Sequence, residues 1–356
     1  MTKKIKDTDY LAVSARVRAM ENSLLTRERM EQVLEARTDE EAVKILQEGG
    51  YPELDPARPE AMDAALSQVR EATLADLSDG IPDARYLDIF KLKYDYHNVK
   101  ALLKAEAMGT DAAHMLMDMG RVPVAELKAA MESGHLEELP PCLAAAAEEA
   151  RSVLNTTRDP QLSDMTLDRW CYREMLEAAE TTGSAFLQGY VQVQIDAANL
   201  RSLVRTLRMG KNADFLRGVL FDGGDVDKAA ILRVSADGGA GLAELYAPTT
   251  LAEAGAAGAD ILKSGAMTEF EKLCDDAVSG YLSAAQFVPF GEAPLIGYLA
   301  ARETEYTNLR PGHLSGSLRG GGQGQDTGAG QNGLRGDLPH GDAGQGYGGA
   351  AGSLQG

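Results

Sequence analysis

A six-residue pattern that occurs three times limits how this chain can fold. Each copy has an acidic residue, two variable residues, an asparagine, a valine or leucine and a base, at residues 95–100, 196–201 and 305–310. Between the first two copies, an offset of 101 also aligns Leu102 with Leu203 and Met108 with Met209. Self-similarity at this period predicts three related units of about 100 residues in a pseudo-threefold arrangement.

The positions of the copies predict how the units are assembled. A full length of chain follows Asp95 and Asp196, whereas little chain follows Glu305. The third unit can then be completed only by residues 1–94, so the two ends of the chain should meet. We therefore predict helical lobes at 95–195 and 196–291, and a lobe in which residues 1–94 pack with a helix near 292–310. The three lobes would close into a ring or funnel.

Local patterns predict an all-α fold. Apolar residues recur at helical spacing over most of the chain, and aromatic residues make up only 6%. Thr38 and Glu41 have the spacing of a capping box before one helix, and Gly49 and Gly50 predict its end. Residues 190–195 alternate in polarity like a strand, but they run without a turn into the second motif copy, so we predict a helix there.

The charge of the chain limits its partners. The formal net charge is −19, which excludes nucleic acid as a direct partner because phosphate binding needs a basic stripe. No stretch approaches the roughly 20 apolar residues of a spanning helix, and the first lysines precede no apolar region of a signal peptide. Three widely spaced cysteines also indicate reduced thiols. These features predict a cytoplasmic protein.

The repeated motif has a structural interpretation. Its residues are Asp95, Asn98, Lys100, Asp196, Asn199, Arg201, Glu305, Asn308 and Arg310. Acid and base are five residues apart, which is not the favoured i,i+4 pairing. An asparagine amide on a packed helix face can bridge backbone groups where helices meet. We interpret the motif as a helix-packing signature; the alternative is that the three copies line a shared interface.

No pattern in the chain predicts reaction chemistry. Residues 258–264 lack the second glycine of a P-loop, and residues 239–244 fail the dinucleotide-binding pattern. Residues 222–225, Asp-Gly-Gly-Asp, indicate a helix-terminating turn. The histidines have no metal-ligand spacing. We therefore predict no catalytic, cofactor-binding or metal-binding residues, no cofactor and no small-molecule substrate, and the residues alone point to an interaction scaffold.

The C-terminal tail differs from the rest of the chain. Residues 312–356 hold 17 of the 38 glycines and show no apolar period. Such a segment buries too little apolar surface to offset the entropy of ordering it, so we predict disorder over 311–356.

Three stretches together resemble a known family. They are residues 94–104 (YDYHNVKALLK), the second motif copy with Phe215-Leu216 and Gly223-Gly224 after it, and residues 294–310 (PLIGYLAARETEYTNLR). They resemble the C subunit of archaeal and bacterial V/A-type ATPases, the counterpart of the d subunit of the eukaryotic V-ATPase. The resemblance covers about residues 8–310.

The resemblance implies a three-lobed helical funnel that is a rotor part and not an enzyme. One face would sit on the proteolipid ring (K/c subunits), and a socket would hold the foot of the central stalk, made of the D and F subunits. Torque would pass through it between ATP hydrolysis or synthesis and proton or sodium transport. The protein would be peripheral at the membrane as part of the complex, without a direct membrane span. The alternatives are a helical adaptor unrelated to a rotary motor, and an enzyme with a cryptic site.

The third motif copy departs from the family pattern. Its helix should continue towards the C-terminus, but Pro311 and Gly312 follow at once. We hypothesise that residues 311–356 are a frameshifted reading of the normal terminus; a functional natural tail is the alternative. The nucleotide sequence around codon 311 distinguishes the two.

Overall fold

The computed structural model describes residues 6–36, 38–52, 54–55, 58–78, 80–83, 85–263 and 265–309. Over these residues the chain forms α-helices and short 3-10 helices and contains no strand. The predicted all-α fold class is thereby confirmed. Arg310, Pro311 and the tail at 312–356 lie outside the described residues.

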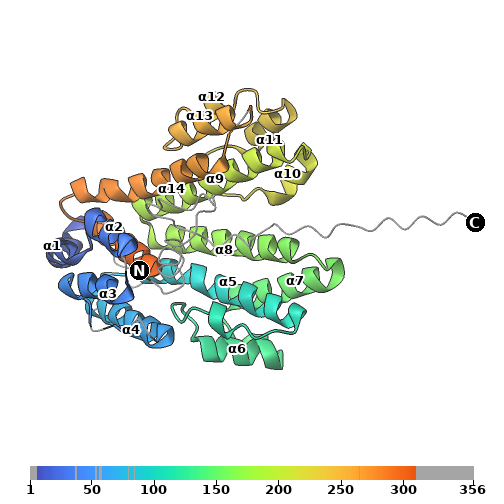
Figure 1. The fold of residues 1–356 in the computed structure, drawn as a ribbon. Helices are drawn as coiled ribbons and strands as arrows, with labels where there is room; N and C mark the ends of the chain where they lie inside the picture. Colours follow the sequence, from blue (N-terminus) through green and yellow to red (C-terminus); the bar gives the residue numbers. More distant parts are fainter. Residues whose placement is uncertain are drawn as a thin grey trace, which may run out of the picture.

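The helices form three groups in different parts of the molecule (Figure 1). The first group consists of α1 (Leu11–Met20), α2 (Arg27–Glu35), α3 (Asp39–Glu48) and α4 (Pro59–Ser78). The second consists of α5 (Arg85–Met108), α6 (Val124–Ser133), α7 (Pro141–Thr157) and α8 (Pro160–Thr182). The third consists of α9 (Ala185–Arg208), α10 (Ala213–Val219), α11 (Lys228–Ala236), α12 (Leu242–Tyr246), α13 (Ala252–Ile261) and α14 (Met267–Ser283). The short 3-10 helices are η1 (Asp7–Tyr10), η2 (Glu21–Ser23), η3 (Ala113–Met115), η4 (Leu136–Glu138) and η5 (Ala284–Phe287).

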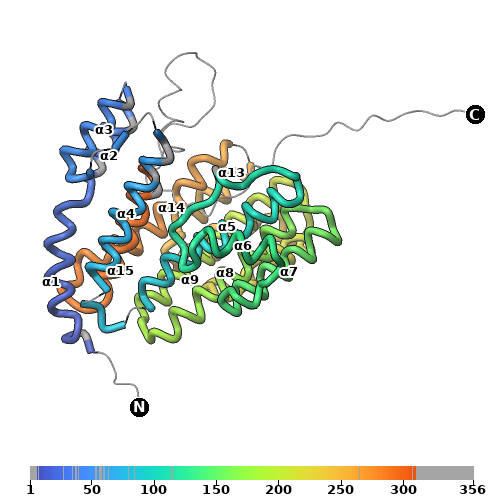
Figure 2. Tube along the Cα trace, turned by 90° about the horizontal axis from the view of Figure 1, so that it is seen from below, coloured from blue at the N-terminus to red at the C-terminus, as the bar shows by residue number. Residues whose placement is uncertain are grey.

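The last described helix, α15 (Glu292–Leu309), returns to the first group. Figure 2 shows it beside α4, and it packs against α1, α4, α5, α9 and α14. Its residues Tyr306 and Leu309 share an apolar cluster with Val33, Leu46 and Leu66. The beginning and the end of the described chain therefore share a core, while the exact lobe boundaries stay a prediction.

Several local features follow from the sequence. The Thr38 hydroxyl accepts the N–H of Glu41, and Gly49 and Gly50 (φ 92°) end that helix, as predicted. Residues 190–195 lie inside α9, which confirms the prediction of a helix there. The apolar pattern does not predict α13, because alanine and glycine dominate its sequence and give little contrast between its faces.

The described residues form three apolar clusters. The largest spans α1, the end of α4, α5, α6, α7, α8, α9 and the first half of α15. A second lies within the α9–α14 group, and the third joins α2, α3 and α4 to the end of α15. Among the described helices, none is both long enough and apolar enough to cross a membrane.

Candidate functional site

The first motif copy holds a loop against α5. The buried Asp95 carboxylate accepts the N–H groups of Arg121 at 2.9 Å and Val122 at 3.2 Å through Oδ1. The Asn98 amide donates to the Met117 carbonyl at 2.7 Å and accepts the Met117 N–H at 2.8 Å. Acid and asparagine together therefore satisfy backbone groups at both ends of the segment 117–122, and we call this arrangement the helix–loop clasp.

The second copy forms the same clasp on α9. Asp196 accepts the N–H groups of Asp225 at 3.0 Å and Val226 at 3.1 Å. The Asn199 amide donates to the Phe221 carbonyl at 3.0 Å and accepts the Phe221 N–H at 2.8 Å. The asparagine therefore bridges the N–H and the carbonyl of one loop residue. The sequence interpretation expected such bridging where two helices meet, whereas here the partner is a loop.

A glycine gives each carboxylate room to reach its loop. A Cβ on Gly120 would overlap Oδ1 of Asp95, and a Cβ on Gly224 would overlap Oδ1 of Asp196. Helix α10 has already ended with its C-cap at Leu220. Residues 222–225 are therefore not the helix-terminating turn that their sequence indicates; Gly224 belongs to the clasp.

The motif base pairs with a different helix. Lys100 Nζ lies 2.5 Å from Asp168 of α8, and both side chains are buried. One turn further along α5, Lys104 Nζ lies 2.6 Å from Asp164 of α8. The acid and the base of one motif copy thus do not pair with each other, as their spacing predicts.

The same two ion pairs recur in the second copy. Arg201 pairs with Asp275 of α14, and Arg205 lies 2.7 Å from Glu271 of α14. The bases are offset by 101 residues from those of the first copy and their acids by 107. The acids on α8 and α14 were not predicted from the sequence, although their common offset of 107 residues is a signal that marks them.

The third copy lies where α15 meets residues of the first helix group. Glu305 accepts the Leu25 N–H at 3.3 Å and the Tyr51 hydroxyl proton, and Arg302 donates to it at 2.9 Å. Asn308 is half-buried, and Arg310 lies outside the described residues. The acidic residue again receives a backbone N–H, this time from a segment about 280 residues earlier.

The clasp carboxylates differ electrostatically. Burial raises the pKa of Asp196 to about 6, against the two N–H groups that lower it, and the nearby Asp225 charge raises it further. Burial also raises the pKa of Asp95, but there the Arg121 guanidinium, 2.8 Å from Oδ2, opposes the rise. The second clasp has Asp225 where the first has Arg121, so it lacks this compensating charge.

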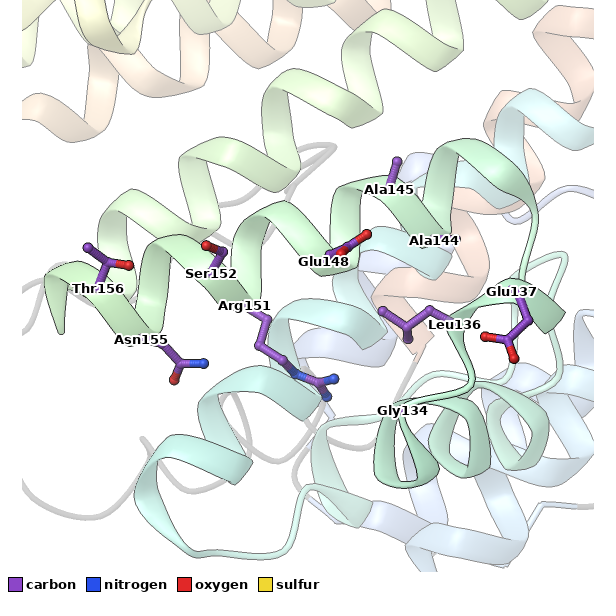
Figure 3. Close-up of a pocket in the computed structure, with 10 residues that line it drawn as sticks. All are labelled: Gly134, Leu136, Glu137, Ala144, Ala145, Glu148, Arg151, Ser152, Asn155 and Thr156. Atoms are coloured by element: carbon purple, nitrogen blue, oxygen red, sulfur yellow. The ribbon is translucent and has the colours of Figure 1, made fainter.

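One open pocket of about 770 Å³ lies along α7, beside η4 and the end of α6 (Figure 3). Figure 3 shows Glu148, Arg151 and Asn155 of α7 among its lining side chains. Arg151 is already engaged, because its Nη2 donates to Glu106 at 2.9 Å and to the Met131 carbonyl at 2.8 Å. None of the motif residues lines this pocket.

Metal-binding and reactive-thiol chemistry find little support in the described residues. No group of three or more histidine, cysteine or carboxylate side chains there could hold a metal ion. Cys142, Cys171 and Cys274 are free thiols. Burial raises the pKa of Cys274 to about 12 and that of Cys171 further, so both stay protonated and unreactive.

Comparisons with known proteins place this architecture in a family. A family model described as the ATP synthase (C/AC39) subunit matches residues 13–311, a range that includes all three motif copies. The chain is 26% identical over 309 residues to the C subunit of the V-type sodium ATPase of Enterococcus hirae, and the match covers 85% of this chain and 92% of the relative. It is 27% identical over 338 residues to the C subunit of the A-type ATP synthase of Methanocaldococcus jannaschii, covering 87% and 84%. The chain therefore belongs to the family of ATP synthase C/AC39 subunits.

Proposed function

We propose that this chain is the non-catalytic rotor subunit that joins the central stalk of a V/A-type ATPase to its membrane ring. In this role it receives the foot formed by the D and F subunits in a socket and rests on the proteolipid ring. It transmits torque between ATP hydrolysis or synthesis and the transport of protons or sodium ions. It is then a peripheral protein at the cytoplasmic face of the membrane.

The observation that carries this proposal is the attachment of the first helix group to α15. Glu305 of α15 binds the Leu25 backbone and Tyr51. In the segment before α15, the Gly291 carbonyl accepts the Ser14 hydroxyl proton at 3.2 Å, and the Ala285 carbonyl of η5 accepts from Arg18 at 3.0 Å. A body that carries torque must resist relative rotation of its parts, and the contacts of the first helix group with α15 and the residues just before it supply that resistance.

The repeated clasp supports a pseudo-threefold socket. Two copies have the same hydrogen bonds and the same pair of interhelical ion pairs. Equivalent lobes around one axis suit a subunit that holds a shaft on that axis. The names of the relatives, the C subunits of a V-type sodium ATPase and of an A-type ATP synthase, support the choice of machine.

A bridging experiment tests this function. The immobilised proteolipid ring is mixed with the purified D and F subunits, with and without this chain. We expect the ring to retain D and F only when the chain is present, and the chain alone to bind each of them. A chain that binds neither the ring nor the D–F pair contradicts the proposal and favours an unrelated adaptor.

A further inference from the structure

Two exposed methionines occupy equivalent positions in the repeat. Met108 and Met209 are aligned by the offset of 101 residues, and they are 73% and 55% exposed. Of the chain's 13 methionines, all but Met1 lie in the described part, and every other methionine there is buried or half-buried. The two exposed methionines of the described chain are therefore the two that the repeat aligns.

The same kind of helix end surrounds each methionine. Met108 is the last residue of α5, and Met209 is the C-cap of α9. Gly109 (φ 64°) and Gly210 (φ 63°) follow them in the left-handed conformation. The N–H of the next residue returns at 3.0 Å to a carbonyl of the last helical turn, from Thr110 to Ala105 and from Lys211 to Thr206. Both helices therefore end in a Schellman motif.

The Schellman motif accounts for the glycines but not for the methionines. The left-handed position requires glycine, whereas an exposed C-cap accepts many side chains. Other aligned residues have a visible structural role, since the motif acids hold loops, the motif bases pair with acids, and Leu102 and Leu203 are buried. What the two copies share at the C-cap is a thioether that solvent reaches.

Both methionines lie at the same end of a row of helices. Helix α8 packs against α5 and α9, and Figure 1 shows it between them. The two ion pairs between α5 and α8 join rising residue numbers on α5 to falling numbers on α8, so these helices are antiparallel. Helix α9 turns back along α8 after Gly183. Helices α5 and α9 therefore run in the same direction, and Met108 and Met209 mark one end of the row.

The cysteines of the described chain are poorer targets for oxidation. Cys171 and Cys274 are fully buried. Cys142 is half-buried, and burial raises its pKa above the ordinary value, so little of it is thiolate. A thioether has no proton to lose, and its oxidation depends on access of the oxidant. Met108 and Met209 are therefore the most accessible sulfur groups among these residues.

We propose that Met108 and Met209 are paired sites of reversible oxidation by peroxide. A sulfur lone pair attacks one oxygen of hydrogen peroxide, so that an S–O bond forms and the O–O bond breaks. The sulfur is oxidised by two electrons to a sulfoxide, and the proton on the transferred oxygen passes to the leaving hydroxide, which gives water. The reverse step uses a reductase with two thiols, which become a disulfide while the oxygen leaves as water.

Oxidation at these two positions changes the surface and leaves the core intact. A polar sulfoxide on a buried residue such as Met119 or Met131 would disrupt apolar packing. At the two C-caps the added oxygen is hydrated, and the hydrogen bonds that end the helices involve backbone groups alone. One end of the helix row thus changes from apolar to polar with its oxidation state. This inference does not rest on the proposed function.

Timed exposure of the full chain to hydrogen peroxide tests the sites. Peptide mass spectrometry, with fragmentation to assign the oxidised residue, measures the rate at each methionine. We expect Met108 and Met209 to gain one oxygen atom at similar rates, about tenfold faster than the buried Met119. Equal rates at these two residues and the half-buried Met165, or a rate at either of them as slow as at Met119, overturn the paired site.

A second experiment tests reversibility and the intact fold. The oxidised chain is incubated with both stereospecific methionine sulfoxide reductases and a dithiol, and we expect both sulfoxides to disappear. The double variant Met108→Leu, Met209→Leu keeps a similar volume, so it should lose the fast phase of oxygen uptake and keep the unfolding temperature. Sulfoxides that the reductases leave in place, a fast phase in the double variant, or an unfolding temperature of the native chain that falls during the fast phase contradict the proposal.

Discussion

At the scale of single residues, two buried carboxylates attach loops to the long helices. Asp95 and Asp196 each accept two backbone N–H groups, and the close approach requires Gly120 and Gly224. A carboxylate that replaces water for two amide groups satisfies donors that would otherwise be buried without partners. In these two copies the motif acid accepts backbone N–H groups, and Asp95 also pairs with the Arg121 guanidinium.

Replacing Gly224 by alanine tests this role. The new Cβ would overlap the Asp196 carboxylate, so the loop must move and lose its hydrogen bonds. We expect Gly224→Ala to lower the free energy of unfolding by about 3 kcal/mol in denaturant titrations. The control is Gly280→Ala in α14, where the added Cβ meets no atom within 4 Å and the change should stay within about 1 kcal/mol. Similar changes in unfolding free energy for Gly224→Ala and Gly280→Ala would contradict the role of Gly224 in the helix–loop clasp.

The charge of Asp196 predicts a dependence of stability on pH. Its folded-state pKa of about 6 is above the ordinary 3.8, so the folded protein binds this proton more tightly than the unfolded chain. The stabilisation from this group is complete below about pH 3.8 and is lost as the pH rises through 6, about 3 kcal/mol in total. The carboxyl ¹³C resonance of Asp196 should titrate with a midpoint near pH 6. A midpoint near the ordinary value would contradict this.

At the scale of helices, ion pairs fix how the long helices pack. Lys100 and Lys104 of α5 pair with acids of α8, and Arg201 and Arg205 of α9 pair with acids of α14. Successive pairs are one turn apart on each helix, so each row fixes the register between two helices. A shift by one turn would leave buried charges without partners, which is strongly unfavourable.

Removing one member of a buried pair tests this register. Lys100→Met leaves the Asp168 carboxylate buried without its cation, so we expect a loss of about 3 kcal/mol in unfolding free energy. Adding Asp168→Leu should recover most of that loss. Lys263→Met is the control, because its pair with Asp260 is 80% exposed on both sides and contributes below about 1 kcal/mol. Equal effects of the two single substitutions would argue against a role in register.

At the scale of the whole molecule, α15 joins the first group of helices to the rest. It contributes Tyr306 and Leu309 to the cluster of the first group, and Leu295 and Ile296 to the largest cluster. Family membership confirms the resemblance to the C subunit of V/A-type ATPases and the prediction of a non-catalytic subunit. The family match ends at residue 311, and the frameshift origin of 311–356 stays a prediction.

The junction at Glu305 predicts where the molecule loosens first. Glu305→Ala removes the acceptor for the Leu25 N–H and for Tyr51, so the first helix group loses part of its attachment to α15. Hydrogen exchange measured by mass spectrometry should rise in residues 25–51 and stay unchanged in residues 213–261, which belong to the second cluster. A uniform rise over both segments would show that Glu305 acts on global stability alone.

The sequence by itself determined the all-α class, most of the helices and the repeat, but not α13, over the residues that the structure describes. Helical periodicity, caps such as Thr38 and glycine stops are local signals, since they depend on residues only a few positions apart. The duplicated motif likewise singled out Asp95, Asn98 and Lys100 and their counterparts in the second copy, Asp196, Asn199 and Arg201.

Only the tertiary structure decided what those residues bind. The partner of Lys100 is Asp168, 68 residues away, and the partner of Glu305 is Leu25, 280 residues away. Likewise, Arg70, Lys93 and Glu303 become one cluster only when helices from distant parts of the chain pack together. The physical reason is that a periodic pattern tells which face of a helix is buried, whereas the partner of a buried charge depends on which helices meet and in which register.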